Sequence, residues 1–183
     1  TQGVSSAASD VYKRQYVGSP ASGVGNAVAL TTSGEDDYKA FTPAATSGNV
    51  YLSALVNLSA AQTTGDYFLC FGSGITTYSV KLYAKSDGAG GFNFGVAKVG
   101  TTPNYESTAR TFNTTYLVVL KYAYSTAATN DDPVSVFINP TLGGAEGIPS
   151  FSYSGTAQTD VTTLCSASSR QCYRSTNSQG RWN

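Results

Sequence analysis

Short runs in which apolar and polar residues alternate recur through the middle of the chain. In residues 51–58, YLSALVNL, every second residue from Leu52 to Leu58 is apolar and falls on one face of a period-two strand. Residues 80–85, VKLYAK, repeat this alternation. Residues 67–71, YFLCF, are apolar on both faces, which is typical of a strand covered on both sides. The pattern predicts β-strands with one shared core.

Turn residues and further strands complete the pattern. Residues 87–91, DGAGG, favour a hairpin between 80–85 and the return strand 92–98. Residues 115–124 and 134–140 are rich in Tyr, Val and Phe and predict two more strands. Weaker strands are expected at 27–30, 38–42 and 151–153. About nine closely spaced strands, with no internal helix or repeat, favour a sandwich or barrel of antiparallel sheets.

Composition narrows the function classes. The chain has 183 residues, of which 40% are hydrophobic and only 12% charged, so we expect one domain with a core. It contains no His, which excludes Ser-His-Asp triads and His-ligated zinc. The balance of 11 basic and 11 acidic residues argues against a nucleic-acid partner. No apolar run approaches the roughly 20 residues of a membrane helix, so we expect no membrane insertion.

The two ends differ from the body. Residues 16–164 hold ten acidic and six basic residues, a net charge of −4, and we expect them to form the domain. Residues 1–15 contain SSAASDVYKRQ, which resembles a translated adapter from environmental sequence assemblies, and we assign them to no domain. Residues 165–183 hold three Arg, no acidic residue and the only Trp, and they lack strand or helix periodicity.

A reading-frame slip near Leu164 would explain this tail. Shifted by one nucleotide, residues 175–182 permit Ala-Pro-Thr-Val-Lys-Val-Asp-Gly, which alternates polar with apolar residues and ends in a turn dipeptide. A disordered terminus is the plainer alternative. Either way we expect residues 165–183 to be irregular and loosely packed. A central, well-paired strand there would argue against the slip.

The body also resembles a known family. TTSGEDDYKAFTP (31–43), VYLSALVNLSAAQTTGDYFLCFGS (50–73), KSDGAGGFNFGVAK (85–98) and NTTYLVVLKYAYSTAATNDDPVSVFINP (113–140) resemble a domain of large secreted proteins from bacteria with type IX secretion. That domain is similar to the laminin-G and concanavalin A-like jelly roll. The family pattern ends in a segment like GNATAPTVKVDG, which the shifted tail permits.

The resemblance implies an all-β fold, an antiparallel jelly-roll sandwich, and a role in adhesion or recognition. We therefore expect a non-catalytic module, secreted or at the cell surface, that is a monomeric part of a longer chain. A spacer role stays open. The alternative is a carbohydrate-binding module attached to a catalytic domain elsewhere. A glycan or another cell-surface polymer is the expected partner.

Carboxylates are candidates for catalysis or for calcium. Concanavalin-like glycosidases place paired carboxylates about 5 Å apart on one strand, in a Glu-x-Asp-x-x-Glu pattern. Residues 35–37, Glu-Asp-Asp, are contiguous and do not fit it, so we expect no catalytic residues. Oxygen-rich loops suit calcium. We expect no cofactor, with structural calcium as an alternative at 35–37, Asp66 or the loop formed by Asn130, Asp131 and Asp132.

Cysteines and tyrosines complete the candidates. Cys70 is expected to be a buried apolar thiol, while Cys165 and Cys172 are candidates for a disulfide if the tail is in frame. Several tyrosines are candidates for a sugar-stacking platform, although we expect about half of them to be core or cross-strand packing. They are Tyr78, Tyr83, Tyr105, Tyr122 and Tyr124.

Overall fold

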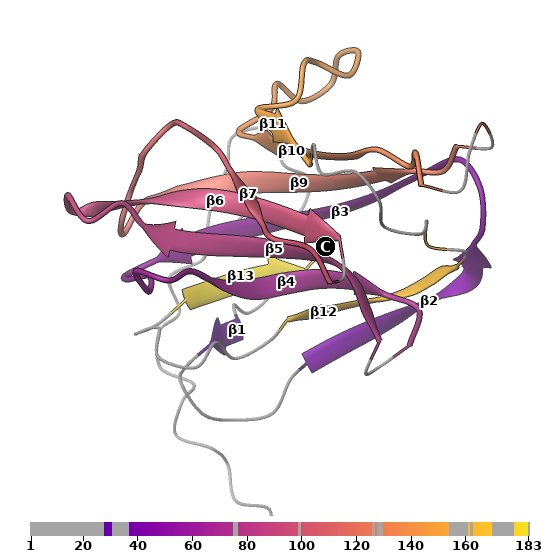
Figure 1. The fold of residues 1–183 in the computed structure, drawn as a ribbon, viewed down its shortest axis with the longest axis horizontal. Coiled ribbons are helices and arrows are strands. Elements are labelled where there is room, and N and C mark those ends of the chain that lie inside the picture. Colours follow the sequence, from indigo (N-terminus) through magenta and orange to yellow (C-terminus); the bar gives the residue numbers. More distant parts are fainter. Residues whose placement is uncertain are drawn as a thin grey trace, which may run out of the picture.

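The computed structural model consists of β-strands joined by turns and loops (Figure 1). It describes residues 28–30, 37–74, 77–98, 100–125, 127, 130–153, 161, 163–169 and 178–182. The described residues form strands and no helix, so none of them belongs to a helix that could span a membrane.

Long strands alternate with two- or three-residue strands at the sheet edges. The longer ones are β2 (Asp37–Ala45), β3 (Asn49–Leu58), β4 (Asp66–Gly72), β5 (Tyr78–Ser86), β6 (Gly91–Lys98), β9 (Thr115–Ala123), β10 (Val134–Ile138), β12 (Leu164–Ser169) and β13 (Ser178–Trp182). The short ones are β1 (Val28–Leu30), β7 (Asn104–Tyr105), β8 (Arg110–Thr111) and β11 (Phe151–Ser152). All of the strands expected from the sequence are present. The strands β7, β8, β12 and β13 were not predicted from the sequence.

The strands pair antiparallel in two sheets. Sheet A has six strands in the order β1-β13-β3-β9-β10-β11, and sheet B has seven, with the order β2-β12-β4-β5-β6-β7 and β8 paired to β6. Strands distant in sequence become neighbours, as in β3 with β9 and β12 with both β2 and β4. Figure 1 shows sheet B in front of β3, β9 and β13. This interleaving confirms the predicted antiparallel β-sandwich of jelly-roll type.

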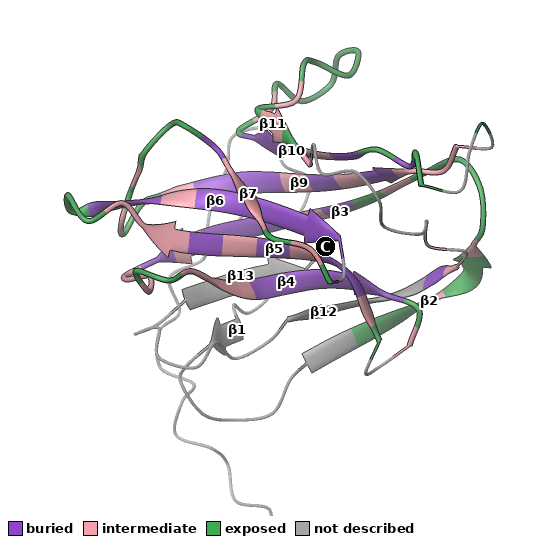
Figure 2. Ribbon diagram, viewed as in Figure 1, coloured by how far each residue is buried: buried purple, intermediate pink, exposed green. Residues whose placement is uncertain are grey.

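The core fills the space between the sheets. The apolar positions identified by alternation in the sequence supply most of its side chains, and Figure 2 shows the buried residues concentrated on β4, β5, β6 and β9. Core side chains include Leu52, Val56, Leu82, Phe94 and Val136. Cys70 is fully buried, as expected, but it does not belong to the core cluster.

The β5–β6 hairpin forms at the predicted turn. The carboxylate of Asp87 accepts hydrogen bonds from the backbone N–H groups of Ala89 and Gly91, both at 2.8 Å. Gly88 and Gly90 adopt φ values of 75° and 97°, which glycine adopts more readily than other residues. Local turn chemistry therefore fixes the register that aligns β5 with β6.

The tail departs from its prediction. β12 lies between β2 and β4, and β13 lies between β1 and β3. The expectation of an irregular tail is therefore wrong for residues 165–169 and for Ser178–Trp182, because β12 and β13 each pair with a strand on both sides, which satisfies their backbone N–H and C=O groups. This pairing argues against a reading-frame slip. Residues 1–15 and Cys172 lie outside the described residues, and the domain boundaries stay predictions.

Candidate functional site

The solvent side of sheet B carries a continuous group of aromatic and basic side chains. On β5, Val80, Leu82 and Ala84 point into the core, so the residues between them face outward. Tyr83 lies opposite Tyr67 of β4 on one side and Gly95 of β6 on the other. We call the group the tyrosine–lysine strip. Its members, all half-buried, are Tyr67, Tyr78, Lys81, Tyr83, Lys85 and Tyr105.

Two β-bulges bring tyrosines onto this face. Strict alternation would align Tyr67 with the core residue Leu69, and Tyr78 with the core residue Val80. The β4–β5 register shifts between Tyr67 and Leu69 and again between Phe71 and Gly72, which places Tyr67 opposite Tyr83 and Tyr78 opposite Gly72. A bulge re-aims side chains because it adds one residue to one strand.

At one end of the strip, the Tyr67 ring lies near the rings of two other tyrosines. Its ring centroid lies 6.0 Å from that of Tyr78 and 5.7 Å from that of Tyr83, both in tilted arrangements. The Lys81 ammonium lies 4.3 Å from the Tyr67 centroid, in cation–π range. Tyr67 was not among the predicted platform residues, because the apolar run 67–71 indicates a strand covered on both sides. Its position at the start of that strand was the available signal.

Tyr105 forms the other end and lies against glycines. A Cβ atom built at Gly95 would fall 2.6 Å from two ring carbons of Tyr105, and one at Gly65 would overlap the Tyr105 hydroxyl. Only glycine leaves room for the ring at these two positions. The Lys85 ammonium lies 4.8 Å from the ring centroid. The ring is therefore seated on the sheet instead of extending into solvent.

The strip combines neutral tyrosine hydroxyls with two positively charged lysine side chains. Burial, together with the nearby Tyr105 and Asp66, raises the pKa of Tyr83 to about 12. Burial and then Asp66 also raise the pKa of Tyr105. These hydroxyls stay protonated at neutral pH and can donate hydrogen bonds. Within the described part of the chain, neither Lys81 nor Lys85 forms a salt bridge.

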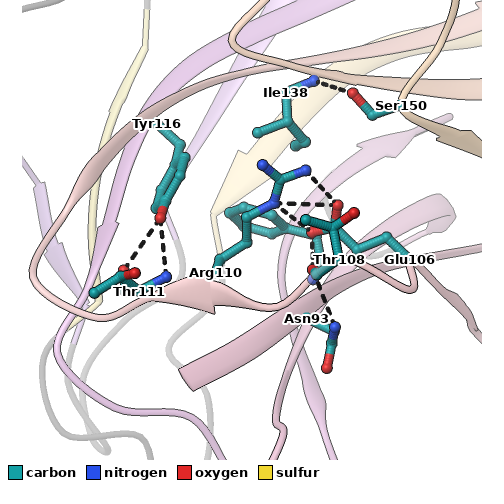
Figure 3. A network of polar contacts seen from close by, with 9 residues as sticks. Asn93, Glu106, Thr108, Arg110, Thr111, Tyr116, Ile138 and Ser150 are labelled. Carbon is teal, nitrogen blue, oxygen red and sulfur yellow. Dashed lines mark hydrogen bonds and ion pairs between the residues drawn. The ribbon is translucent and has the colours of Figure 1, made fainter. Parts of the chain in front are cut away.

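A buried ion pair holds the segment that carries Tyr105 (Figure 3). Glu106 follows Tyr105 directly, and its carboxylate accepts hydrogen bonds from Nε and Nη2 of Arg110, the shortest at 2.6 Å. The same carboxylate accepts the Phe94 N–H at 3.1 Å, while the Glu106 N–H donates to the Phe94 carbonyl. The Glu106 side chain is only 2% exposed. This clamp fixes β7 against β6.

Two of the predicted platform tyrosines lie elsewhere. Tyr122 is 0% exposed and belongs to the core, where its hydroxyl donates to the Asp132 carboxylate. Tyr124 packs partly buried against the core and donates to the Ala45 carbonyl. The platform prediction is wrong for these two because they continue the alternation of Val118 and Leu120 on β9, whose side chains belong to the core. It is right that Tyr78, Tyr83 and Tyr105 come together.

The calcium candidates make ordinary protein contacts where the structure describes them. Asp132 is buried and also accepts the Ser125 N–H at 2.5 Å, while Asp131 accepts the Ser125 hydroxyl at 2.7 Å. Asp66 accepts the N–H of the next residue. Among the described residues, no three His, Cys, Asp or Glu side chains form a group that could hold a metal ion. Glu35 and Asp36 lie outside them, so calcium stays an alternative.

The described glutamates do not form a catalytic pair. Glu106 is bound in the clamp beside sheet B. Glu146 accepts hydrogen bonds from Lys121 at 2.7 Å and from Tyr51 at 2.5 Å, residues of β9 and β3 on the outer face of sheet A. Each carboxylate has a cationic partner and a backbone or hydroxyl donor. This arrangement is typical of structural tethers.

Fold and strip together define an antiparallel β-sandwich of jelly-roll type with an aromatic, basic outer face. No family model matches the chain, and no curated protein matches it. Among solved structures, it is similar to a native heptameric SAP-like pentraxin from Limulus polyphemus, with a TM-score of 0.44 and 10% identity. The match covers 82% of this chain and 72% of that one. A likeness of this size says nothing about ligands, and the fold assignment rests on the chain's own strand pairing.

Proposed function

We propose that this sandwich is a non-catalytic recognition module of a secreted or cell-surface protein, and that it binds a glycan across the tyrosine–lysine strip. The observation that carries the proposal is the continuity of the strip. Rings from β4, β5 and β7 lie on the solvent side of one sheet, where polar residues are the rule. Tyrosine rings offer apolar faces to sugar rings, and their hydroxyls offer hydrogen bonds.

The local construction supports a binding role over incidental packing. Gly65 and Gly95 leave room for Tyr105, and the Glu106–Arg110 clamp fixes its backbone. The β4–β5 bulges bring Tyr67 onto the same face. A preorganised surface loses little side-chain entropy when a ligand binds. A spacer module needs none of these features.

A glycan array followed by titration calorimetry tests the proposal with the full chain. We expect Tyr67→Ala and Tyr105→Ala each to weaken binding by about two- to tenfold, as loss of an aromatic contact typically does. Tyr51→Ala is the matched control, because Tyr51 is 50% exposed on the opposite sheet. Thermal unfolding of every variant shows that the fold is retained.

Two results would overturn the proposal. Absence of binding to every glycan on the array would leave the chain as a spacer. Binding that Tyr67→Ala and Tyr105→Ala leave intact would place the site on another face. Hydrolysis of a bound glycan would contradict the non-catalytic part alone.

A further inference from the structure

The two lysines of the strip differ from other cations of the sandwich. Arg110 pairs with Glu106, and Lys121 pairs with Glu146. Lys81 and Lys85 instead place their ammonium groups over the rings of Tyr67 and Tyr105. In the described part of the chain no carboxylate forms a salt bridge with either one. Among the residues that the structure describes, the strip thus holds two ammonium groups without a salt-bridge partner.

The surroundings make this local charge distinctive. Residues 16–164 carry a net charge of −4, yet the centre of this face is positive. Asp66 is the carboxylate whose charge acts on Tyr83 and Tyr105, and it also accepts the Tyr67 N–H. Within the described part of the chain, one carboxylate therefore lies near two ammonium groups. Opposite charge on a ligand is the complement of such a face.

Resting on the proposed glycan function, we infer that the tyrosine–lysine strip selects an acidic polysaccharide, in which carboxylate or sulfate groups pair with Lys81 and Lys85 while sugar rings lie against the tyrosines. The Lys81 and Lys85 ammonium groups lie 4.3 and 4.8 Å from ring centroids, so a sugar that packs beside a ring brings its acidic substituent close to a lysine. Partial burial of the lysine stems strengthens such pairs relative to fully exposed ones.

The spacing of the lysines adds a length requirement. They lie four residues apart on β5, so their Cα atoms are about 13 Å apart at roughly 3.3 Å per residue. A single acidic sugar does not reach both. The ligand is therefore a chain with several anionic groups, and its binding should increase with oligosaccharide length until both lysines are engaged.

The test uses matched polymer pairs with the full chain. Polygalacturonate is compared with its carboxyl-reduced form, and dextran sulfate with dextran, by calorimetry at low and high salt. We expect at least one acidic polymer to bind more than tenfold tighter than its neutral partner. The preferred pair identifies carboxylate or sulfate as the source of the charge. The preference should decline from 0.1 M to 1 M salt, where the Debye length falls from about 10 to about 3 Å.

Variants distinguish a specific binding site from non-specific electrostatic attraction. Lys81→Gln and Lys85→Gln should each lower acidic-polymer affinity by about two- to fivefold. Lys121→Gln makes the same charge change on the other sheet and should have no effect. Tyr67→Ala should weaken acidic-polymer binding at unchanged net charge, which non-specific attraction to a polyanion would not show.

The outcomes distinguish this inference from the proposal on which it rests. Equal affinity for the acidic and neutral members of both pairs overturns the acidic-ligand inference and leaves glycan binding intact. Absence of binding to all four polymers also overturns it, and the glycan array then decides whether glycan binding itself fails. If Lys121→Gln weakened acidic-polymer binding as much as Lys81→Gln, the preference would come from the overall charge of the protein and not from the strip, and the inference would be overturned.

Discussion

Removal of one partner from the buried clamp should destabilise the sandwich strongly. In Arg110→Met the aliphatic stem remains, but the Glu106 carboxylate, 2% exposed, loses its cation. A buried charge left without its partner typically costs about 3–5 kcal/mol. For a protein of this size each kcal/mol lowers the melting temperature by about 2–4 °C, so we expect a loss of about 6–20 °C.

A double-mutant cycle isolates the pair. Glu106→Gln should cost less than Arg110→Met, because the Arg110 side chain is 19% exposed and partly hydrated. The double variant should cost less than the two single losses together, with a coupling of about 0.5–3 kcal/mol. Chemical denaturation of the four proteins measures these values.

The chain contains a matched control for burial. The Lys121–Glu146 pair has an N···O distance of 2.7 Å, against 2.6 Å in the clamp, but its carboxylate side chain is 42% exposed. Lys121→Met should therefore lower the melting temperature much less than Arg110→Met. Equal losses of melting temperature in Lys121→Met and Arg110→Met would refute the reasoning from burial. Strictly additive losses of unfolding free energy for Arg110→Met and Glu106→Gln in the double variant would refute it too.

Three further predictions concern the strip and the loop that follows β10. Gly95→Ala should displace the Tyr105 ring and weaken glycan binding about as much as Tyr105→Ala, whereas Gly144→Ala, with no atom within 4 Å of its new Cβ, should bind normally. In alkaline absorbance titration Tyr83 should form its tyrosinate near pH 12, and this step should be absent in Tyr83→Phe. Because this pKa is raised on folding, stability should fall from pH 10 to about 12 in wild type, and less in the variant. The hydrogen bond from Lys121 lowers the pKa of Glu146. The stability that the Glu146 carboxylate contributes to the folded protein should therefore be lost as the pH falls below 4.5. Hydrogen exchange of the loop should then rise in wild type, whereas Glu146→Gln should lack this pH dependence.

The register of β13 bears on the reading frame. It places Ser178 opposite Leu58 and Gly180 opposite Val56, whose side chains belong to the core. The pairing of β13 with β1 and β3 argues against the slip. Sequencing the source DNA through the codons around Leu164 tests the frame directly.

Much of the fold follows from local pattern. Alternation in residues 51–58 and 80–85 identified core positions correctly, because the period of two is the same whichever strand becomes the neighbour. The turn at 87–91 was also predictable, since Asp87 and its glycines act within five residues. The strands β7 and β8 were not, because two-residue strands carry no periodicity and exist only through pairing with β6.

The sequence by itself determined an all-β chain, its principal strands, its core face and its lack of His-based chemistry. Only the tertiary structure decided which tyrosines gather. Tyr67 and Tyr78 reach the outer face through bulges in the β4–β5 pairing, and Tyr105 reaches Gly95 through β7. Tyr122, with the same local alternation, enters the core instead. A side chain's face is set by the register between strands, and register depends on partners that local sequence does not name.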